Sequence, residues 1–296
     1  MLKLKSLSCP QSDSSINMQV LKYVDGKTTV VADLPESARG IAYLPTNQLL
    51  FVNQEDGSLQ VVNDKGQIKV WLPGGQLFSP NAVCVGLSGL YVEDAQRLVM
   101  AIDPRHMMVS PMLGQRGQEN LRLYRVNSEM SSDSCGGLCV DFDGSVLIAS
   151  PKRNRIFRAG TDSLLVDWIG TGEVGFSTGH AQCRLNRPCG IARVDTRTVV
   201  SDTGNFVLRI FRGQDPLSVI GMPGEAGGTD SADGMPRFQD PTDLADLGSA
   251  VVVLDGWNLR LCHLNSQTVE TVYRGRGPLR AVTTGRQAIY FTETLL

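Results

Sequence analysis

The sequence predicts an all-β protein built from one repeated four-stranded unit, and three observations lead to this prediction. Helical periodicity is nearly absent, because no window of about 12 residues carries a sustained apolar stripe at i, i+3, i+4 and i+7. Short apolar or alternating runs recur instead, and most are bounded by Gly, Asn, Asp or Pro, as strands are. Glycine (31 residues) and proline (14 residues) are frequent enough in the 296-residue chain for the many turns of such a fold.

A short step, in most cases a small residue followed by an apolar one, marks the first strand of each unit. The six steps are Gly40-Ile41-Ala42, Ala82-Val83-Cys84, Gly137-Leu138-Cys139, Gly190-Ile191-Ala192, Asp243-Leu244-Ala245 and Arg280-Ala281-Val282. A second strand, a turn and a hairpin follow, which makes four strands in all. The complete units are predicted at about residues 33–72, 73–112, 130–170, 183–221 and 237–274.

The sixth unit, at residues 278–296, holds only two strands. Residues 16–32 supply two further strands that precede the first step and have no step of their own. Joining these two pairs completes the sixth unit and closes a ring that leaves no free sheet edge between the first and last units. We therefore predict a single-domain, six-bladed β-propeller over residues 1–296, with its last blade closed by the N-terminal strands.

Composition excludes several other classes of protein. Apolar residues make up 42% of the chain, which is too many for a disordered protein, and the net charge of −2 disfavours a general binder of nucleic acid or anionic membranes. No apolar run approaches the roughly 18 residues of a membrane helix. Seven cysteines, an odd number, and the lack of a secretory signal predict reduced thiols in an intracellular, cytoplasmic protein with no membrane partner.

The fourth unit carries a more specific pattern. Pro188-Cys189-Gly190-Ile191-Ala192 is followed by Asp202-Thr203-Gly204-Asn205, and the fifth unit has Asp255-Gly256-Trp257-Asn258 in the corresponding place. Glycine-rich stretches, opening at Gly170 and Gly221, precede both units. Over roughly residues 170–264 these features resemble the NHL repeat. The resemblance implies a propeller fold whose relatives include metal-binding lyases, calcium-binding hydrolases and RNA-binding domains.

The Asp-x-x-Asn spacing predicts structural turn residues, because Asp and Asn side chains can bond the backbone amides of a tight turn. We assign this role to Asp202, Asn205, Asp255 and Asn258. Asp243 and Arg280 occupy the same position in adjacent units. We predict that they form a structural ion pair at the mouth of the central channel, and a catalytic pair is the alternative.

An enzymatic interpretation would require a metal site in the channel. The histidines His106, His180 and His263 do not fall at the mouth ends of the marker strands. Those mouth positions read Arg39, Asn81, Gly136, Cys189, Thr242 and Leu279, which offer too few oxygen ligands for calcium. The cysteine spacings do not match a zinc site either. We therefore expect no catalytic residue, no metal and no cofactor, with a propeller lyase or lactonase as the alternative.

Basic residues gather in the loops and turns predicted to share one face. Three long loops, at residues 113–134, 170–187 and 221–240, enlarge this face, and loops of such length are often functional. The resulting prediction is a non-enzymatic scaffold that binds a protein partner or a larger assembly. Its predicted partner-binding residues are Arg116, Tyr124, Arg125, Lys152, Arg153, Arg184, Arg187, Phe238 and Trp257.

The same arginines allow a second interpretation, in which the face binds RNA as in some NHL propellers. Glu173, Asp230 and Asp233 lie in the same kind of loop and weaken that interpretation. If these acids neutralise the arginines, protein binding is favoured over RNA binding.

Overall fold

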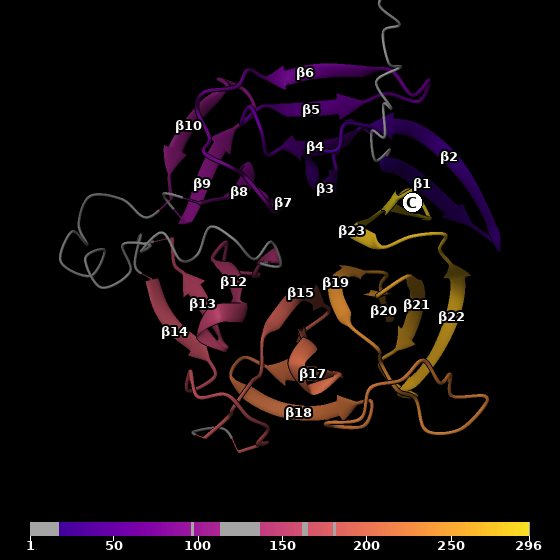
Figure 1. Ribbon diagram of the computed structural model, residues 1–296. Helices are drawn as coiled ribbons and strands as arrows, with labels where there is room; N and C mark the ends of the chain where they lie inside the picture. The colour runs from indigo at the N-terminus through magenta and orange to yellow at the C-terminus, as the bar shows by residue number, and fades with distance from the viewer. Residues whose placement is uncertain (1–17, 96–97, 113–136, 162–164, 180–181, 296) are drawn as a thin grey trace, which may run out of the picture.

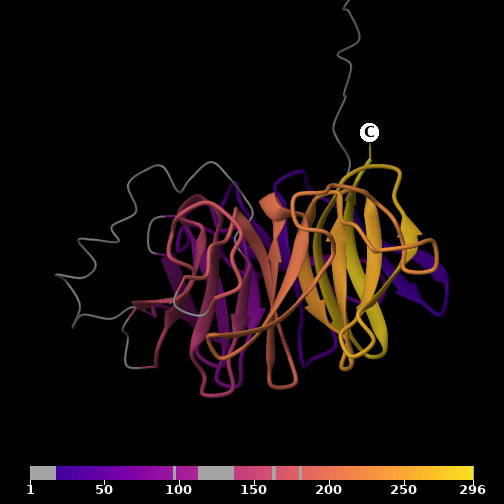
Figure 2. The ribbon, with the colours of Figure 1, turned by 90° about the horizontal axis from the view of Figure 1, so that it is seen from below.

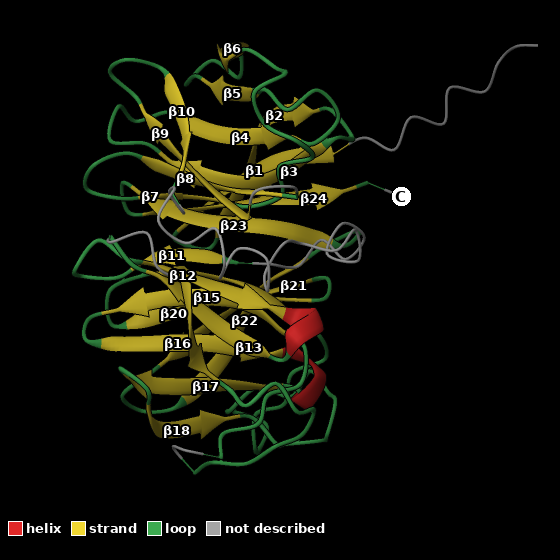
Figure 3. Cartoon of the chain, turned by 90° about the vertical axis from the view of Figure 1, so that its left-hand side faces the viewer, coloured by secondary structure: helices red, strands yellow, loops and turns green. Residues whose placement is uncertain are grey.

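The computed structural model describes residues 18–95, 98–112, 137–161, 165–179 and 182–295. Six antiparallel sheets of four strands each surround a central axis, which confirms the predicted six-bladed β-propeller (Figure 1). Within the described ranges the helices are two short 3-10 turns, η3 (Pro151–Arg153) and η4 (Thr203–Asn205), both at one edge of the molecule (Figure 3). No helix in those ranges is long and apolar enough to cross a membrane.

The blades are numbered in chain order of their innermost strands. Blade 1 contains β3 (Ala38–Tyr43), β4 (Leu49–Asn53), β5 (Leu59–Val62) and β6 (Ile68–Leu72). Blade 2 contains β7 (Val83–Val85), β8 (Leu90–Asp94), β9 (Leu98–Asp103) and β10 (Met108–Pro111). Blade 3 contains β11 (Leu138–Val140), β12 (Val146–Ser150), β13 (Arg155–Ala159) and β14 (Leu165–Ile169). Blade 4 contains β15 (Pro188–Val194), β16 (Arg197–Asp202), β17 (Val207–Arg212) and β18 (Asp215–Ile220). Blade 5 contains β19 (Pro241–Asp246), β20 (Ala250–Asp255), β21 (Asn258–His263) and β22 (Thr268–Arg274).

Blade 6 joins the two ends of the described chain, as predicted. Its strands are β23 (Leu279–Gly285), β24 (Ala288–Thr294), β1 (Met18–Val24) and β2 (Lys27–Leu34), in the spatial order β2-β1-β24-β23. Strand β1 pairs antiparallel with β24, and Val20 lies opposite Thr292. The ring is therefore closed by backbone hydrogen bonds within one sheet.

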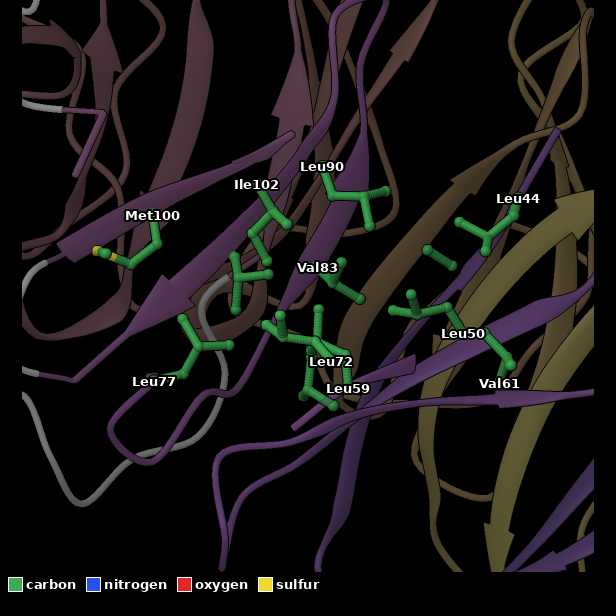
Figure 4. Packing of buried hydrophobic residues seen from close by; sticks show 13 residues of the cluster. Leu44, Leu50, Leu59, Val61, Leu72, Leu77, Val83, Leu90, Met100 and Ile102 are labelled. Carbon is green, nitrogen blue, oxygen red and sulfur yellow. The ribbon is translucent and has the colours of Figure 1, made fainter. Parts of the chain in front are cut away.

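The hydrophobic core lies between the faces of neighbouring blades. The second strands are apolar on both faces, and β4, β12 and β20 are buried along their whole length because another blade covers each side. Figure 4 shows the cluster between blades 1 and 2, in which Leu50 and Leu72 lie close to Val83 and Ile102. Stacking of this kind buries apolar side chains that a single sheet would leave exposed.

The glycines of the repeated step have a structural reason, because the innermost strands of adjacent blades nearly touch there. A Cβ atom on Gly40 would lie 2.8 Å from the Asn81 carbonyl oxygen of blade 2, and one on Gly190 would lie 2.3 Å from the Thr242 oxygen of blade 5. The Gly40 N–H also donates to that Asn81 oxygen at 2.9 Å. Glycine thus allows the backbones to meet directly around the axis.

The disc has two unlike faces. On the mouth face, loops lead into the innermost strands and turns join the second strand of each blade to the third. On the far face, turns join the first strand to the second and the third to the fourth. The C-terminal end of β24 lies on the mouth face (Figure 2), because Glu293 pairs with Leu279 at the start of β23.

Candidate functional site at the mouth of the axial channel

The innermost strands enclose an axial channel with a cavity of about 790 Å³. All six blades contribute to its wall, and the loop residues Glu36, Asp240 and Trp257 contribute at the mouth face. Five of the six mouth positions of the sequence prediction fall on described residues, and all five line the cavity, namely Arg39, Asn81, Cys189, Thr242 and Leu279. The lining is therefore chemically mixed, but the Asn81 amide donates to Glu93, the Cys189 thiol to the Arg187 carbonyl and the Thr242 hydroxyl to the Leu254 carbonyl.

Trp257 stands at this mouth in the two-residue turn between β20 and β21, and 48% of it is exposed. The turn is fixed by its backbone. The Gly256 N–H donates to the Asp240 carbonyl (3.1 Å), the Gly256 carbonyl accepts the Leu279 N–H (3.2 Å), and the Trp257 carbonyl accepts the Gly275 N–H (2.6 Å). Gly256 has a φ of +62°, which glycine adopts without strain. A rigid backbone thus holds a half-exposed indole at the channel.

Arg39 and Arg280 line the same channel from blades 1 and 6, whose innermost strands pack side by side. Nη1 of Arg39 donates to the carbonyls of Glu36 and Ala38, both at 2.8 Å, and Nε of Arg280 makes a long 3.5 Å contact with Thr294 Oγ1. Burial, and next the positive charge of Arg280, lower the pKa of Arg39. Among the described residues, neither guanidinium has a carboxylate within ion-pairing distance.

The predicted ion pair between Asp243 and Arg280 is wrong. Oδ2 of Asp243 instead accepts the backbone N–H of Val282 at 2.8 Å, and Oδ1 accepts the N–H of Leu244 at 2.9 Å. Asp243 does bridge blades 5 and 6, but it does so through the backbone, since the Val282 N–H points at its carboxylate. Burial raises the pKa of Asp243 to about 6, against the opposing effect of these two hydrogen bonds.

A second partly buried carboxyl lies near the mouth in blade 2. Burial raises the pKa of Glu93 to about 7, and the Asn81 side-chain amide, which donates to Glu93 Oε2 at 3.3 Å, opposes that rise. Sequence reasoning missed Glu93, because only its burial distinguishes it from other acidic residues.

Two buried arginines organise the long loops, and sequence reasoning missed both. Arg209 of β17 is fully buried and pairs with Asp202 at 3.3 Å. Its guanidinium also donates to the carbonyls of Ser177 (2.7 Å) and Arg184 (3.3 Å) and lies 4.8 Å from the ring centroid of Phe176. One side chain therefore fixes Phe176, Ser177 and Arg184 of the long loop to blade 4.

Arg260 of β21 plays the same part in blade 5. It pairs with Asp255 at 2.8 Å and with Asp230 at 2.9 Å, and it donates to the Thr229 carbonyl at 2.7 Å. Its guanidinium lies 4.9 Å from the ring centroid of Phe238, which has no exposed surface. The prediction that Phe238 contacts a partner is therefore wrong: this aromatic ring packs under an arginine inside the loop.

The acidic turn residues accept backbone N–H groups of the lead-in loops instead of the backbone amides of their own turns. Asp202 accepts the Asn186 N–H at 2.7 Å, and Asp255 accepts the N–H groups of Gln239 (2.8 Å) and Asp240 (2.7 Å). Burial raises the pKa of Asp202 to about 6, despite the groups that donate to it. In blade 2, Asp94 likewise accepts the Phe78 N–H at 2.7 Å. These carboxylates therefore hold the lead-in loops, whereas the sequence predicts that Asp202 and Asp255 bond the amides of their own turns.

Asn205 and Asn258 differ, although the sequence aligns them. Asn205 lies in the turn of blade 4, where its side-chain amide donates to Asp202 and to the Gly175 carbonyl, both at 2.8 Å. Asn258 is already the first residue of β21 and pairs in register with Asp255. The turn of blade 5 is therefore shorter, and the structure gives Asn258 no turn-capping bond.

The structure brings several of the predicted basic residues together on the mouth face. The Arg187 N–H donates to Asn154 Oδ1 at 2.9 Å, which places the lead-in loop of blade 4 beside the turn that holds Lys152 and Arg153. Arg184 is exposed but pairs with Glu173 at 2.7 Å, so one of the predicted acids does neutralise an arginine. The predicted binding residues Arg116, Tyr124 and Arg125 lie outside the described residues.

Potential metal ligands are dispersed in the described ranges, where no three His, Cys, Asp or Glu side chains are grouped to hold an ion. His106 pairs with Asp103 (2.7 Å) and His263 contacts Glu270 (3.3 Å) on exposed parts of the blades, away from the channel lining. His180 falls outside the described residues.

No protein-family model matches the chain, and no curated protein matches its sequence. The fold is similar to that of a Bacteroides thetaiotaomicron protein of unknown function (TM-score 0.63, 13% identity, 90% of this chain), and the chain spans 62% of that protein. A chain of the nidogen/laminin complex aligns with a TM-score of 0.62 and 14% identity over 90% of this chain and 97% of that one.

Two enzymes share the fold as well. A gluconolactonase from Xanthomonas campestris aligns with a TM-score of 0.58 and 12% identity over 87% of this chain and 86% of its own. A virginiamycin B lyase from Staphylococcus aureus aligns with a TM-score of 0.55 and 10% identity over 94% and 100%. At such low identity the similarity shows a shared six-bladed propeller and leaves function to be argued from the site.

Proposed function

We propose that this propeller is a non-enzymatic scaffold that binds a protein partner through its mouth face, with Trp257 at the centre of the contact. The observation that carries the proposal is the half-exposed indole held on a rigid turn at the lip of the channel. Such an indole gains little from folding, whereas a tryptophan buried in an interface typically contributes about 2 kcal/mol or more to binding.

Basic side chains would form the border of this contact. Arg187 is exposed on the lead-in loop of blade 4, next to the turn that carries Arg153. Charged groups at the border of an interface mainly raise the association rate and set orientation. Arg209 fixes Ser177 and Arg184, and Asn154 holds the backbone of Arg187, so this border is in place before a partner arrives.

Two finer assignments belong to the proposal. Blades 4 and 5 are NHL repeats, and the same aspartate–arginine pair in both supports this. The protein works inside the cell, which is supported by free thiols at Cys84, Cys139, Cys183, Cys189 and Cys262. We prefer a scaffold to a lyase or lactonase because the described channel residues form no group of metal ligands.

Site-specific photo-crosslinking tests the proposal. A benzoylphenylalanine replaces Trp257 on the mouth face or, as the control, Leu87, which is 98% exposed on the far face. Crosslinking is done in the native source and the product is identified by mass spectrometry. Position 257 is expected to capture one protein partner that position 87 does not.

Binding of that purified partner then decides the role of the surface. Trp257→Ala and the pair Arg153→Glu with Arg187→Glu are each expected to weaken binding at least tenfold, while Leu87→Ala changes it less than twofold. Equal affinity for all these variants would overturn the proposal. So would a crosslink from position 257 to RNA in place of protein, which would favour the nucleic-acid alternative.

A further inference from the structure

Resting on the proposed function, we infer that the mouth of the channel receives an acidic side chain of the partner, whose carboxylate lies between the guanidinium groups of Arg39 and Arg280. The first observation is that the two arginines hold equivalent positions in adjacent blades. In blade 1 the register shifts between Ala38 and Ile41, in blade 6 it shifts in the same way between Leu279 and Val282, and each arginine is the first residue inside this shift. Blades 4 and 5 have the uncharged Cys189 and Thr242 at this position, so two cationic side chains adjoin where blades 6 and 1 meet.

The second observation is the charge environment of this pair. Arg39 and Arg280 lie on adjacent innermost strands, and after burial the positive charge of Arg280 is the next cause that lowers the pKa of Arg39, against a smaller opposing effect of Glu36. Their bonds within the described residues go to neutral oxygens, the carbonyls of Glu36 and Ala38 for Arg39 and the hydroxyl of Thr294 for Arg280. A carboxylate placed between two guanidinium groups would relieve this repulsion and form charge-assisted hydrogen bonds with both.

The acidic residues of the channel wall do not supply that carboxylate. Both oxygens of Asp243 accept backbone N–H groups, from Val282 and Leu244, and neither contacts a guanidinium. Glu36 and Asp240 lie on the lead-in loops at the rim, and neither forms an ion pair with Arg39 or Arg280. Among the described residues, Glu36 attracts Arg39 from beyond ion-pairing distance, and neither guanidinium has a directly paired carboxylate.

The occupant we favour is a side chain on a polypeptide. The half-exposed indole of Trp257 lines the same mouth, where it can cover the apolar part of a peptide whose acid enters the channel. A cavity of about 790 Å³ admits an Asp or Glu side chain with its surrounding water.

The test measures binding of a defined probe, acetyl-hexaglutamate amide, by isothermal titration calorimetry, with acetyl-hexaglutamine amide as the uncharged counterpart. Blocked ends leave side-chain carboxylates as the only anions. The pair Arg39→Gln with Arg280→Gln is compared with the pair Arg105→Gln with Arg212→Gln. The second pair removes the same charge from exposed turns of the far face. Circular dichroism verifies that both double variants are folded.

Wild type and the far-face variant are expected to bind hexaglutamate equally, the mouth variant at least tenfold more weakly, and hexaglutamine should not bind. Absence of binding to wild type, or equal loss in both double variants, would overturn the inference. Binding of a decauridylate RNA is measured as well. If RNA binding requires the mouth arginines and hexaglutamate binding does not, the inference is also overturned.

The two proposals can fail separately. If position 257 crosslinks a partner whose affinity is unchanged by the mouth variant, this inference fails and the scaffold proposal stands. If hexaglutamate binding requires the arginines but position 257 captures no protein, the scaffold proposal fails alone.

Discussion

Arg260 and Asp255 form a 2.8 Å ion pair from which solvent is wholly excluded. The residues occupy defined places, since Asp255 ends the second strand of blade 5 and Arg260 is the third residue of the next strand. Asp202 and Arg209 hold the same places in blade 4, whereas blade 3 has Ser150 and Phe157 there. The chain therefore contains both the charged version of this pair and an uncharged one.

The first prediction follows from that internal comparison. Arg260→Phe should lower the free energy of unfolding by about 3–5 kcal/mol, because it leaves the buried Asp255 carboxylate without its cation. Adding Asp255→Ser, which recreates the blade 3 pair, should recover part of the loss, and chemical denaturation measures both. Simple additivity of the two substitutions would contradict the pairing described above.

The second prediction concerns the contact between blades 4 and 5. Gly190→Ala should destabilise the fold by about 1–3 kcal/mol, because the new methyl group would lie 2.3 Å from the Thr242 carbonyl oxygen. Gly228→Ala is the matched control, since nothing lies within 4 Å of a Cβ at that position. Thermal denaturation of the two variants should separate them, and equal Tm values would refute the close approach of the blades.

The third prediction concerns closure of the ring. Removal of residues 1–34 takes away β1 and β2 and exposes the edge of β24. We expect aggregation or loss of the cooperative unfolding transition, because an open apolar edge pairs readily with other chains. Size-exclusion chromatography and calorimetry provide the readouts. A monomeric product that melts like the full chain would show that the N-terminal strands are dispensable.

The fourth prediction is a pH dependence. The pKa of Asp243 is raised from 3.8 to about 6 by burial, so between about pH 4 and pH 6 the folded state holds a proton that the unfolded state releases. The contribution of Asp243 to stability is therefore lost as the pH rises through this window. The Tm of wild type minus that of Asp243→Asn should fall from pH 4 to pH 6 and stay level above it. A difference that does not vary with pH would contradict the raised pKa.

The fold was predictable because it depends on features that recur. The step at Gly190 repeats in several blades, and residues 16–32 supply the two strands that the last blade lacks. Pairing between β1 and β24 could thus be inferred by completing the pattern, without any knowledge of side-chain contacts.

The site was less predictable because it depends on where single side chains point. Phe238 lies in a long loop, where an aromatic residue is expected to be exposed. Its burial is explained by the guanidinium of Arg260, which packs against its ring. Asp243 was correctly placed at the boundary between two blades, but a backbone N–H competes successfully for its carboxylate. The aspartate–arginine pair occupies the same place in blades 4 and 5, but its spacing along the chain differs. Asp202 and Arg209 are further apart in sequence than Asp255 and Arg260, because the turn of blade 4 is longer.

The pairing of β1 with β24 also sets a schedule for synthesis on the ribosome. Strand β1 is made early, yet its partner begins only at Ala288. At the usual rate of translation this is a wait on the order of tens of seconds. Throughout that time the edge of β1 that later pairs with β24 has no partner strand. Blades 1 to 5 can meanwhile stack in the order in which they are synthesised. A nascent chain stalled before residue 288 would therefore be a target for chaperones that bind exposed strands, and release from them should coincide with completion of the last blade.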